Sequence, residues 1–162
     1  MSGLAGSILR FLEILAVSIW FGAIPALCAL VAPTLFAKLP TRAQAGELFG
    51  HILSKFYISE IALGLFLIVL GMLRWKYFDA PMSFSLVKLV LVALMIGSTA
   101  FVQLSVRPQL RDLRIKIGDF EKTPADNPDR VLFGKLHQQS VMLMGFNWLG
   151  AFILLILLVW KP

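Results

Sequence analysis

Ionisable and polar side chains inside long apolar segments are the residues of this chain best placed to do chemistry. His137, Ser140 and Asn147 fall in the last such segment, at spacings of three and seven residues that put them on one helical face. Gln103 and Arg107 are four residues apart in the third segment and also share a face. A charged side chain at the centre of a membrane helix costs about 2.5–3.5 kcal/mol on insertion scales, so each of these positions needs an explanation.

Glu60 lies about eight residues inside the second apolar segment, at a depth of about 12 Å if the segment is a helix. We expect its charge to pair with Arg107, His137 or Lys55, because an unpaired charge is costly at that depth. In a closed bundle these polar groups would form a track from one membrane edge toward the middle. The candidate polar site comprises Glu60, Gln103, Arg107, His137, Ser140 and Asn147. The alternative is that these side chains only hold the helices together through hydrogen bonds.

The two histidines suggest a further chemistry, because axial histidines commonly hold haem inside helical bundles. His51 and His137 fall at the same predicted membrane edge, so one haem, another tetrapyrrole or a metal is possible there. The alternative is that each is an ordinary polar residue at the membrane surface. No cofactor is predicted firmly, since the sequence has no Cys-x-x-Cys-His, His-Glu-x-x-His, P-loop or dinucleotide-binding motif. No catalytic residue is predicted either.

Four long apolar blocks must position these side chains. The chain is 59% hydrophobic and only 15% charged, whereas soluble domains are about 25% charged. A membrane-spanning helix needs about 20 apolar residues, and backbone groups in hydrocarbon must bond within their own segment. We therefore predict an all-α integral membrane four-helix bundle that forms a single domain over 1–162. The helices are expected at about 8–37, 52–73, 83–106 and 130–160.

The connections carry further local signals. Thr41 is a plausible N-cap for a short helix before the second span, and Asp79 to Pro81 predicts a turn. Residues 109–120 have apolar side chains on one helical face, which favours a short amphipathic helix near the membrane surface. Glu13 lies near the other membrane edge, where we expect it in water or paired with Arg10.

A weak internal echo links the two halves of the chain. Ala32-Pro33-Thr34-Leu35 ends the first span and Arg107-Pro108-Gln109-Leu110 ends the third, while Leu-Phe-Gly precedes the second and the fourth at 48–50 and 132–134. Two helical hairpins in the same orientation would form a parallel repeat. So few shared residues are also what chance would give.

The Lys and Arg residues indicate an orientation. Ten of them fall in or beside the connections 38–52 and 107–135, and five fall on the other side. The positive-inside rule then predicts that both connections are cytoplasmic and both termini are outside. Lipid head groups also account for the net charge of +6, so the lipid bilayer is the expected partner and nucleic acid is not.

The first span carries a row of small residues suited to close helix packing. Ser18, Gly22 and Ala26 recur every four residues, as in small-xxx-small contacts between membrane helices. Trp20 lies too deep for an interfacial anchor and is expected to pack in the core. The row predicts association with other membrane subunits or with a second copy.

Motifs over nearly the whole chain resemble the transmembrane protein 205-like domain family. The resemblance is carried by Trp20-x-Gly22, Ala32-Pro33-x-x-Phe36, Arg107-Pro108 and Phe133-x-x-x-His137-x-x-Ser140 followed by Asn147. It implies a small four-helix membrane protein of largely unknown function, and it implies one site for Arg107, His137, Ser140 and Asn147. Some similarity to four-helix copper-resistance D-type and protoporphyrinogen-oxidase membrane proteins implies haem, although this chain has few histidines.

Three functions remain open from the sequence. The first is a non-enzymatic accessory or scaffold subunit of a membrane complex, which the small size and the small-residue row favour. The second is a haem-, tetrapyrrole- or quinone-linked redox protein that uses His137 or His51. The third is a small-solute transporter or exporter that uses the polar track through Glu60.

Overall fold

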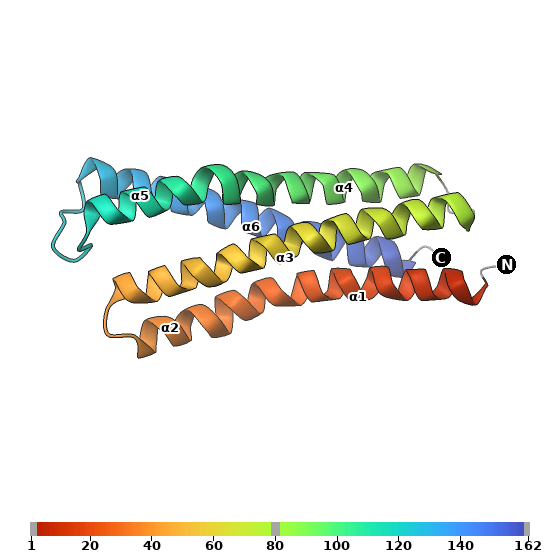
Figure 1. Ribbon diagram of the computed structural model, residues 1–162, viewed down its shortest axis with the longest axis horizontal. Coiled ribbons are helices and arrows are strands. Elements are labelled where there is room, and N and C mark those ends of the chain that lie inside the picture. The colour runs from red at the N-terminus through yellow and green to blue at the C-terminus, as the bar shows by residue number, and fades with distance from the viewer. Residues whose placement is uncertain (1–2, 79–81, 161–162) are drawn as a thin grey trace.

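The computed structural model describes residues 3–78 and 82–160, and these form a bundle of four long helices (Figure 1). The first runs through α1 (Leu4–Ala26), η1 (Leu27–Val31) and α2 (Ala32–Lys38), and the second is α3 (Arg42–Tyr77). The third runs through α4 (Met82–Phe101), η2 (Val102–Val106) and α5 (Arg107–Ile117), and the fourth is α6 (Pro128–Trp160). All four are long and apolar enough to cross a membrane, which confirms the predicted fold class.

Helix α3 differs from the prediction because it starts ten residues earlier than expected. Thr41 is the N-cap, as predicted, and its hydroxyl accepts from the Gln44 backbone N–H at 3.2 Å. The helix that it caps does not stop before the second span but continues to Tyr77. No proline interrupts residues 42–77, so nothing forces a break between the short predicted helix and the span. The predicted turn from Asp79 to Pro81 lies outside the described residues.

Helix α5 confirms the predicted amphipathic helix. Leu113 and Ile117 are buried, and the helix packs along α6. Just beyond it, Phe120 makes an edge-on contact with Phe133 of α6 at 4.9 Å between ring centroids. The helix ends at Gly118, whose φ of 64° is accessible to glycine at little cost.

A short π-helical turn precedes Pro33 in the first long helix and Pro108 in the third. Proline has no N–H and its ring collides with the carbonyl of residue i−4, so a wider turn relieves the conflict without breaking the helix. The same π-helical turn therefore occurs at the two positions where the two halves of the sequence are similar.

Residues at equal separations before these two prolines also match in the core. Trp20 and Met95 each lie thirteen residues before their proline, and both have no exposed surface. Glu13 and Lys88 each lie twenty residues before it, and both are buried. The first and the third long helix thus have matching buried positions before equivalent prolines.

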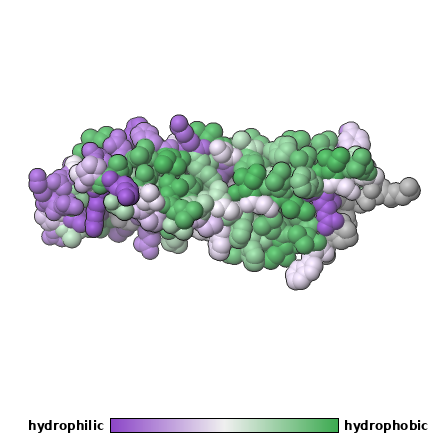
Figure 2. Space-filling model, turned by 90° about the horizontal axis from the view of Figure 1, so that it is seen from below, coloured by the Kyte–Doolittle hydropathy of each residue, from purple (hydrophilic) through white to green (hydrophobic). Residues whose placement is uncertain are grey.

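The four long helices pack in a ring in the order α1, α3, α4 and α6. The repeat-related helices α1 and α4 therefore lie on opposite corners, and α3 and α6 occupy the other two. The main core lies between them and includes Val17, Trp20, Leu67, Met95 and Leu154. Large apolar side chains also cover the outside over much of its length, as a lipid-facing surface requires (Figure 2).

The helices are longer than a bilayer is thick. Helix α3 has 36 residues and hence spans about 54 Å, against about 30 Å of hydrocarbon. The hydrophilic surface gathers at the end that carries the two connections, and the apolar belt lies toward the termini (Figure 2). Along α3, Gly50 and Arg74 are separated by about 36 Å, so a hydrocarbon layer of about 30 Å fits between them.

Candidate functional site

Glu60 lies at the centre of a polar network in the middle of the bundle. Its side chain has no exposed surface. Trp20 Nε1 of α1 donates to Glu60 Oε1 at 2.5 Å, and Thr99 Oγ1 of α4 donates to Glu60 Oε2 at 3.2 Å. One carboxyl group therefore connects three of the four long helices.

The fourth long helix joins the network through Asn147. Its Nδ2 donates to Thr99 Oγ1 at 2.7 Å, which leaves the single Thr99 hydroxyl proton to be donated to Glu60. Ser98 Oγ lies 2.7 Å from Asn147 Oδ1, the acceptor end of the same amide. The donors thus follow one another from Asn147 through Thr99 to Glu60, so the network has a direction that ends on the carboxyl group.

The prediction that Glu60 forms an ion pair with Arg107, His137 or Lys55 is wrong. Within residues 3–78 and 82–160, its hydrogen-bond donors are neutral, and Arg107, His137 and Lys55 form no ion pair with it. Arg107 is eight residues beyond Thr99, which is about 12 Å along the helix, and its guanidinium is used at the membrane edge instead.

Arg107 and Gln103 form a second polar layer, nearer the two connections. Arg107 donates to Gln103 Oε1 at 2.8 Å and to the Gly50 carbonyl at 2.6 Å, and Gln103 Nε2 donates to Ser54 Oγ at 3.0 Å. The Arg107 guanidinium also lies 6.0 Å from the centroid of the buried Tyr57 ring. Two of the predicted site residues are therefore together, but in a layer separate from Glu60 and Asn147.

His137 and Ser140 join neither layer. His137 is exposed and stacks on Phe133 with ring centroids 6.3 Å apart, while Ser140 donates to the His137 carbonyl in its own helix. His51 is exposed as well. Among the residues that the structure describes, no group of three or more His, Cys, Asp or Glu is arranged to hold a metal. Haem binding by His137 or His51 stays a prediction, and an absorption spectrum of the purified protein tests it.

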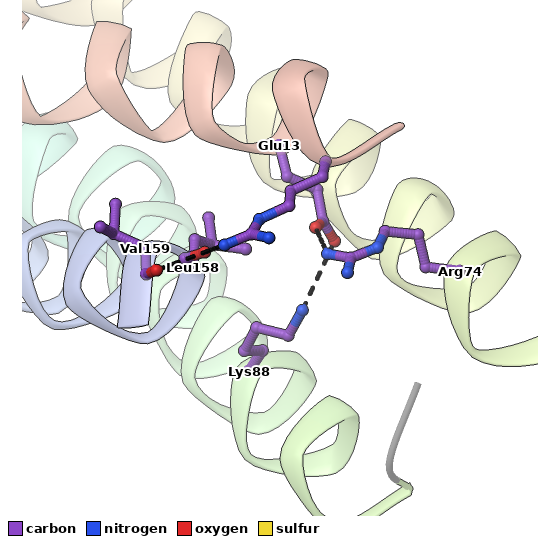
Figure 3. Close-up of polar contacts among 6 residues, drawn as sticks. Glu13, Arg74, Lys88, Leu158 and Val159 are labelled. Atoms are coloured by element: carbon purple, nitrogen blue, oxygen red, sulfur yellow. Dashed lines mark hydrogen bonds and ion pairs between the residues drawn. The ribbon is translucent and has the colours of Figure 1, made fainter. Parts of the chain in front are cut away.

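A third polar layer lies at the edge near the termini (Figure 3). Glu13, with only 3% of its surface exposed, forms ion pairs with Arg74 of α3 and, at 3.6 Å, with Lys88 of α4. Arg10 instead donates to the carbonyls of Leu158 and Val159 at the end of α6. The expectation that Glu13 is solvated or paired with Arg10 is therefore wrong, because cations from two other helices reach it.

Sequence reasoning missed several residues of these layers. Thr99 carries the central network, and it shares a helical face with Gln103 and Arg107 at spacings of four residues, a signal that was available. Trp20 was expected to pack in the core, which is confirmed, but its role as a donor to Glu60 was not anticipated. Arg74 and Lys88 looked like ordinary residues at the ends of spans.

The small-residue row of the first span does not pack inside the bundle. Ser18 and Gly22 are exposed and Ala26 is half-buried, so the row faces outward. The close helix approaches are at other glycines. A Cβ on Gly64 would lie 2.5 Å from Ile96 Cγ1, and one on Gly150 would lie 2.8 Å from Met95 Sδ.

Comparison with known proteins gives one match. A family model described as a domain of unknown function, DUF4149, matches residues 15–118, which run from within α1 to the end of α5. No curated protein and no solved structure matches the chain. These comparisons do not link the chain to the transmembrane protein 205-like domain family, so that resemblance stays a prediction.

Proposed function

The chain belongs to the DUF4149 family, a domain of unknown function, and from its geometry we propose that it is a non-enzymatic accessory or scaffold subunit of a membrane complex. The observation that carries the proposal is a pair of outward-facing small-residue surfaces, one on each repeat. Helices in lipid associate mainly where small side chains let two backbones approach closely.

The first surface is formed by Ser18 and Gly22 of α1, and the second by Ala93 and Gly97 of α4. All four residues are exposed, and a Cβ added to either glycine would meet no atom within 4 Å. Both glycines lie eleven residues before the proline of their repeat, so the two surfaces occupy equivalent positions. Each offers a stretch of small side chains on which a helix of a partner subunit or of a second copy could pack closely.

The interior supports a scaffold role in a different way. The central side chains of Trp20, Glu60, Thr99 and Asn147 satisfy one another, and together they connect all four long helices. Such a network fixes the helices relative to one another. A rigid bundle presents its outer surfaces in a constant geometry, which suits a subunit on which others assemble.

The test is the size of the native complex after gentle solubilisation of the membrane. Gly22→Ile and Gly97→Ile should each shift the protein from a larger complex to a smaller one, because a branched side chain prevents this close packing. Gly145→Ile is the matched control, since Gly145 of α6 is exposed but is flanked at four residues by Val141 and Leu149. A wild-type chain that migrates as a lone monomer, or variants that leave the complex intact, would contradict the proposal.

The same proposal includes an orientation in which both termini are outside and the connections 38–52 and 107–135 are cytoplasmic. It rests on the excess of Lys and Arg in those connections. Because Cys28 is the only cysteine, Cys28→Ser gives a background for single reporter cysteines. Lys122→Cys should be labelled by a membrane-impermeant thiol reagent only after the cells are opened, and Ser2→Cys in intact cells as well. The reverse pattern would overturn the orientation.

A small-solute transporter remains a second candidate, with the proton as the simplest solute. It is favoured by a carboxyl group in the middle of the bundle that ends an oriented series of hydrogen-bond donors. Proton flux into liposomes that is lost in Glu60→Gln but kept in the exposed-site control Glu47→Gln would support it. Equal proton flux in the two variants would rule out transport through Glu60.

A further inference from the structure

Arg114 of α5 lies across a glycine floor on α3. A Cβ on Gly46 would be 3.1 Å from Arg114 Nη2, and a Cβ on Gly50 would be 3.9 Å from Arg114 Nη1. On its other side, the Arg114 guanidinium lies 5.7 Å from the centroid of the Phe133 ring. The two glycines therefore create the room in which this half-buried side chain is held between α3 and α6.

Arg114 has no acceptor for its donors within the part of the chain that the structure describes. Its guanidinium lies over the Phe133 ring and is attracted by the nearby carboxylate of Glu47, which is too far away to form an ion pair with it. Arg107, seven residues earlier on the same helical face, has acceptors in Gln103 and Gly50, but both are neutral. Two guanidinium groups thus approach Gly50, and within the described residues neither donates a hydrogen bond to a carboxylate; Glu47 acts on Arg114 only at longer range.

The position of this pair along the bundle matches the level of lipid phosphates. Gly50 lies about 36 Å along α3 from Arg74, so a hydrocarbon layer of about 30 Å between these two residues would place Gly50 near its edge on the side of the two connections. Side chains of a helix lean toward its N-terminus, so Arg114 leans back toward the membrane from its place in α5. Basic pockets between membrane helices at this level bind anionic head groups.

We propose that Arg107 and Arg114, over the floor formed by Gly46 and Gly50, bind the phosphate group of an anionic ligand. A guanidinium presents a planar fork of donors that matches two oxygens of one phosphate. The N–H groups of Arg114, which have no acceptor among the described residues, would donate to these oxygens. The phosphate belongs either to an anionic phospholipid in the surrounding leaflet or to a soluble phosphate monoester. Both have the same chemistry at the site.

The test is native mass spectrometry of the full chain in detergent, titrated with phosphatidylglycerol, phosphatidylcholine or glycerol 3-phosphate. We expect Arg114→Gln to weaken binding of the anionic ligand about tenfold, as the loss of a charge-assisted contact predicts. Arg111→Gln is the matched control, because it removes the same charge from the same helix at a side chain that is 77% exposed. Gly46→Ala is a second variant, whose Cβ would lie 3.1 Å from Arg114 Nη2 and so shift the guanidinium by a few tenths of an ångström without changing any charge.

The outcomes separate the sources of the phosphate. Binding of phosphatidylglycerol that falls in Arg114→Gln and Gly46→Ala but not in Arg111→Gln supports a lipid ligand. The same pattern with glycerol 3-phosphate supports a soluble ligand. Equal affinity in Arg114→Gln and Arg111→Gln, or equal affinity of the wild type for phosphatidylglycerol and phosphatidylcholine with no binding of glycerol 3-phosphate, would overturn the proposal.

Discussion

Glu13 and Glu60 are the same residue type, and both are almost fully buried, with exposed fractions of 3% and 0%. Their surroundings differ sharply. Glu13 has the cations of Arg74 and Lys88 against it, whereas Glu60 accepts hydrogen bonds from the neutral side chains of Trp20 and Thr99. Position along the membrane normal explains the difference. Near an edge, long basic side chains can keep their heads close to water, but in the middle each further charge would need its own compensation.

The largest effect is expected from Glu60→Ala. The change removes the acceptor of two buried donors and leaves a cavity where the four helices meet, so unfolding should become easier by about 3 kcal/mol. Chemical unfolding in mixed micelles, followed by circular dichroism, measures it. Glu60→Gln keeps one oxygen acceptor and most of the volume and should cost less than half as much. Equal losses in the two variants would mean that the acidic group itself is required.

Glu13→Ala should have the next largest effect, about 2 kcal/mol in the same measurement. It leaves the side chain of Arg74, with 13% of its surface exposed, without its carboxylate. Water at the edge can replace part of that contact, and this keeps the loss below that of Glu60→Ala. Glu47→Ala, at an exposed carboxyl group that forms no ion pair with any described residue, is the control and should change little. A greater loss of stability in Glu13→Ala than in Glu60→Ala would contradict the expected order of the two buried glutamates.

Trp20→Phe tests the contribution of one hydrogen bond to Glu60 at the central site. Phenylalanine keeps an aromatic ring in the core but has no N–H for Glu60 Oε1, so we expect a loss of about 1 kcal/mol. Trp148→Phe, at a partly exposed ring that stacks on Phe21, is the control for a general effect of replacing tryptophan. If the two variants lose the same stability, the indole hydrogen bond contributes nothing of its own.

The smallest effect, and the one whose sign is most informative, is expected from Ser85→Ala. Ser85 is 4% exposed, and its buried hydroxyl has no hydrogen-bond partner among the described residues. It lines a cavity of about 20 Å³ beside Glu13 and Lys88. Removing an unsatisfied buried donor should leave stability unchanged or raise it by up to about 1 kcal/mol. A clear loss of stability would show instead that a water fills the cavity and bonds to the hydroxyl.

The number of helices could be predicted from the number of apolar blocks, and their type could be predicted because a bilayer admits only helices there. Four apolar blocks of bilayer length have no alternative to helices in hydrocarbon. The ends of α3 and α5 could not be placed in the same way, since they extend past the lipid and are decided by packing against α2 and α6. Thr41 is an exception, because its capping hydrogen bond is local and readable from the sequence.

The candidate site could be predicted only in part. Glu60, Asn147, Gln103 and Arg107 were found from the cost of polar groups in a membrane, a cost that depends on the residue and its depth alone. Their grouping depends on which way each helix faces, and a sequence fixes that poorly when apolar residues cover all sides. His137 shows the difficulty, since it shares a spacing with Asn147 and yet is exposed beyond the polar layers.

The repeat also has a consequence for how the two halves recognise each other. Glu13 and Lys88 occupy equivalent positions on the diagonal helices α1 and α4, and they meet as opposite charges. Two second halves associated in the same geometry would bring ammonium against ammonium, and like charges at a buried contact disfavour a pairing by several kcal/mol. In two first halves each Glu13 would lose Lys88 and keep only Arg74 of its own half as a counter-charge. The covalent chain therefore joins two halves whose charges at this contact are complementary.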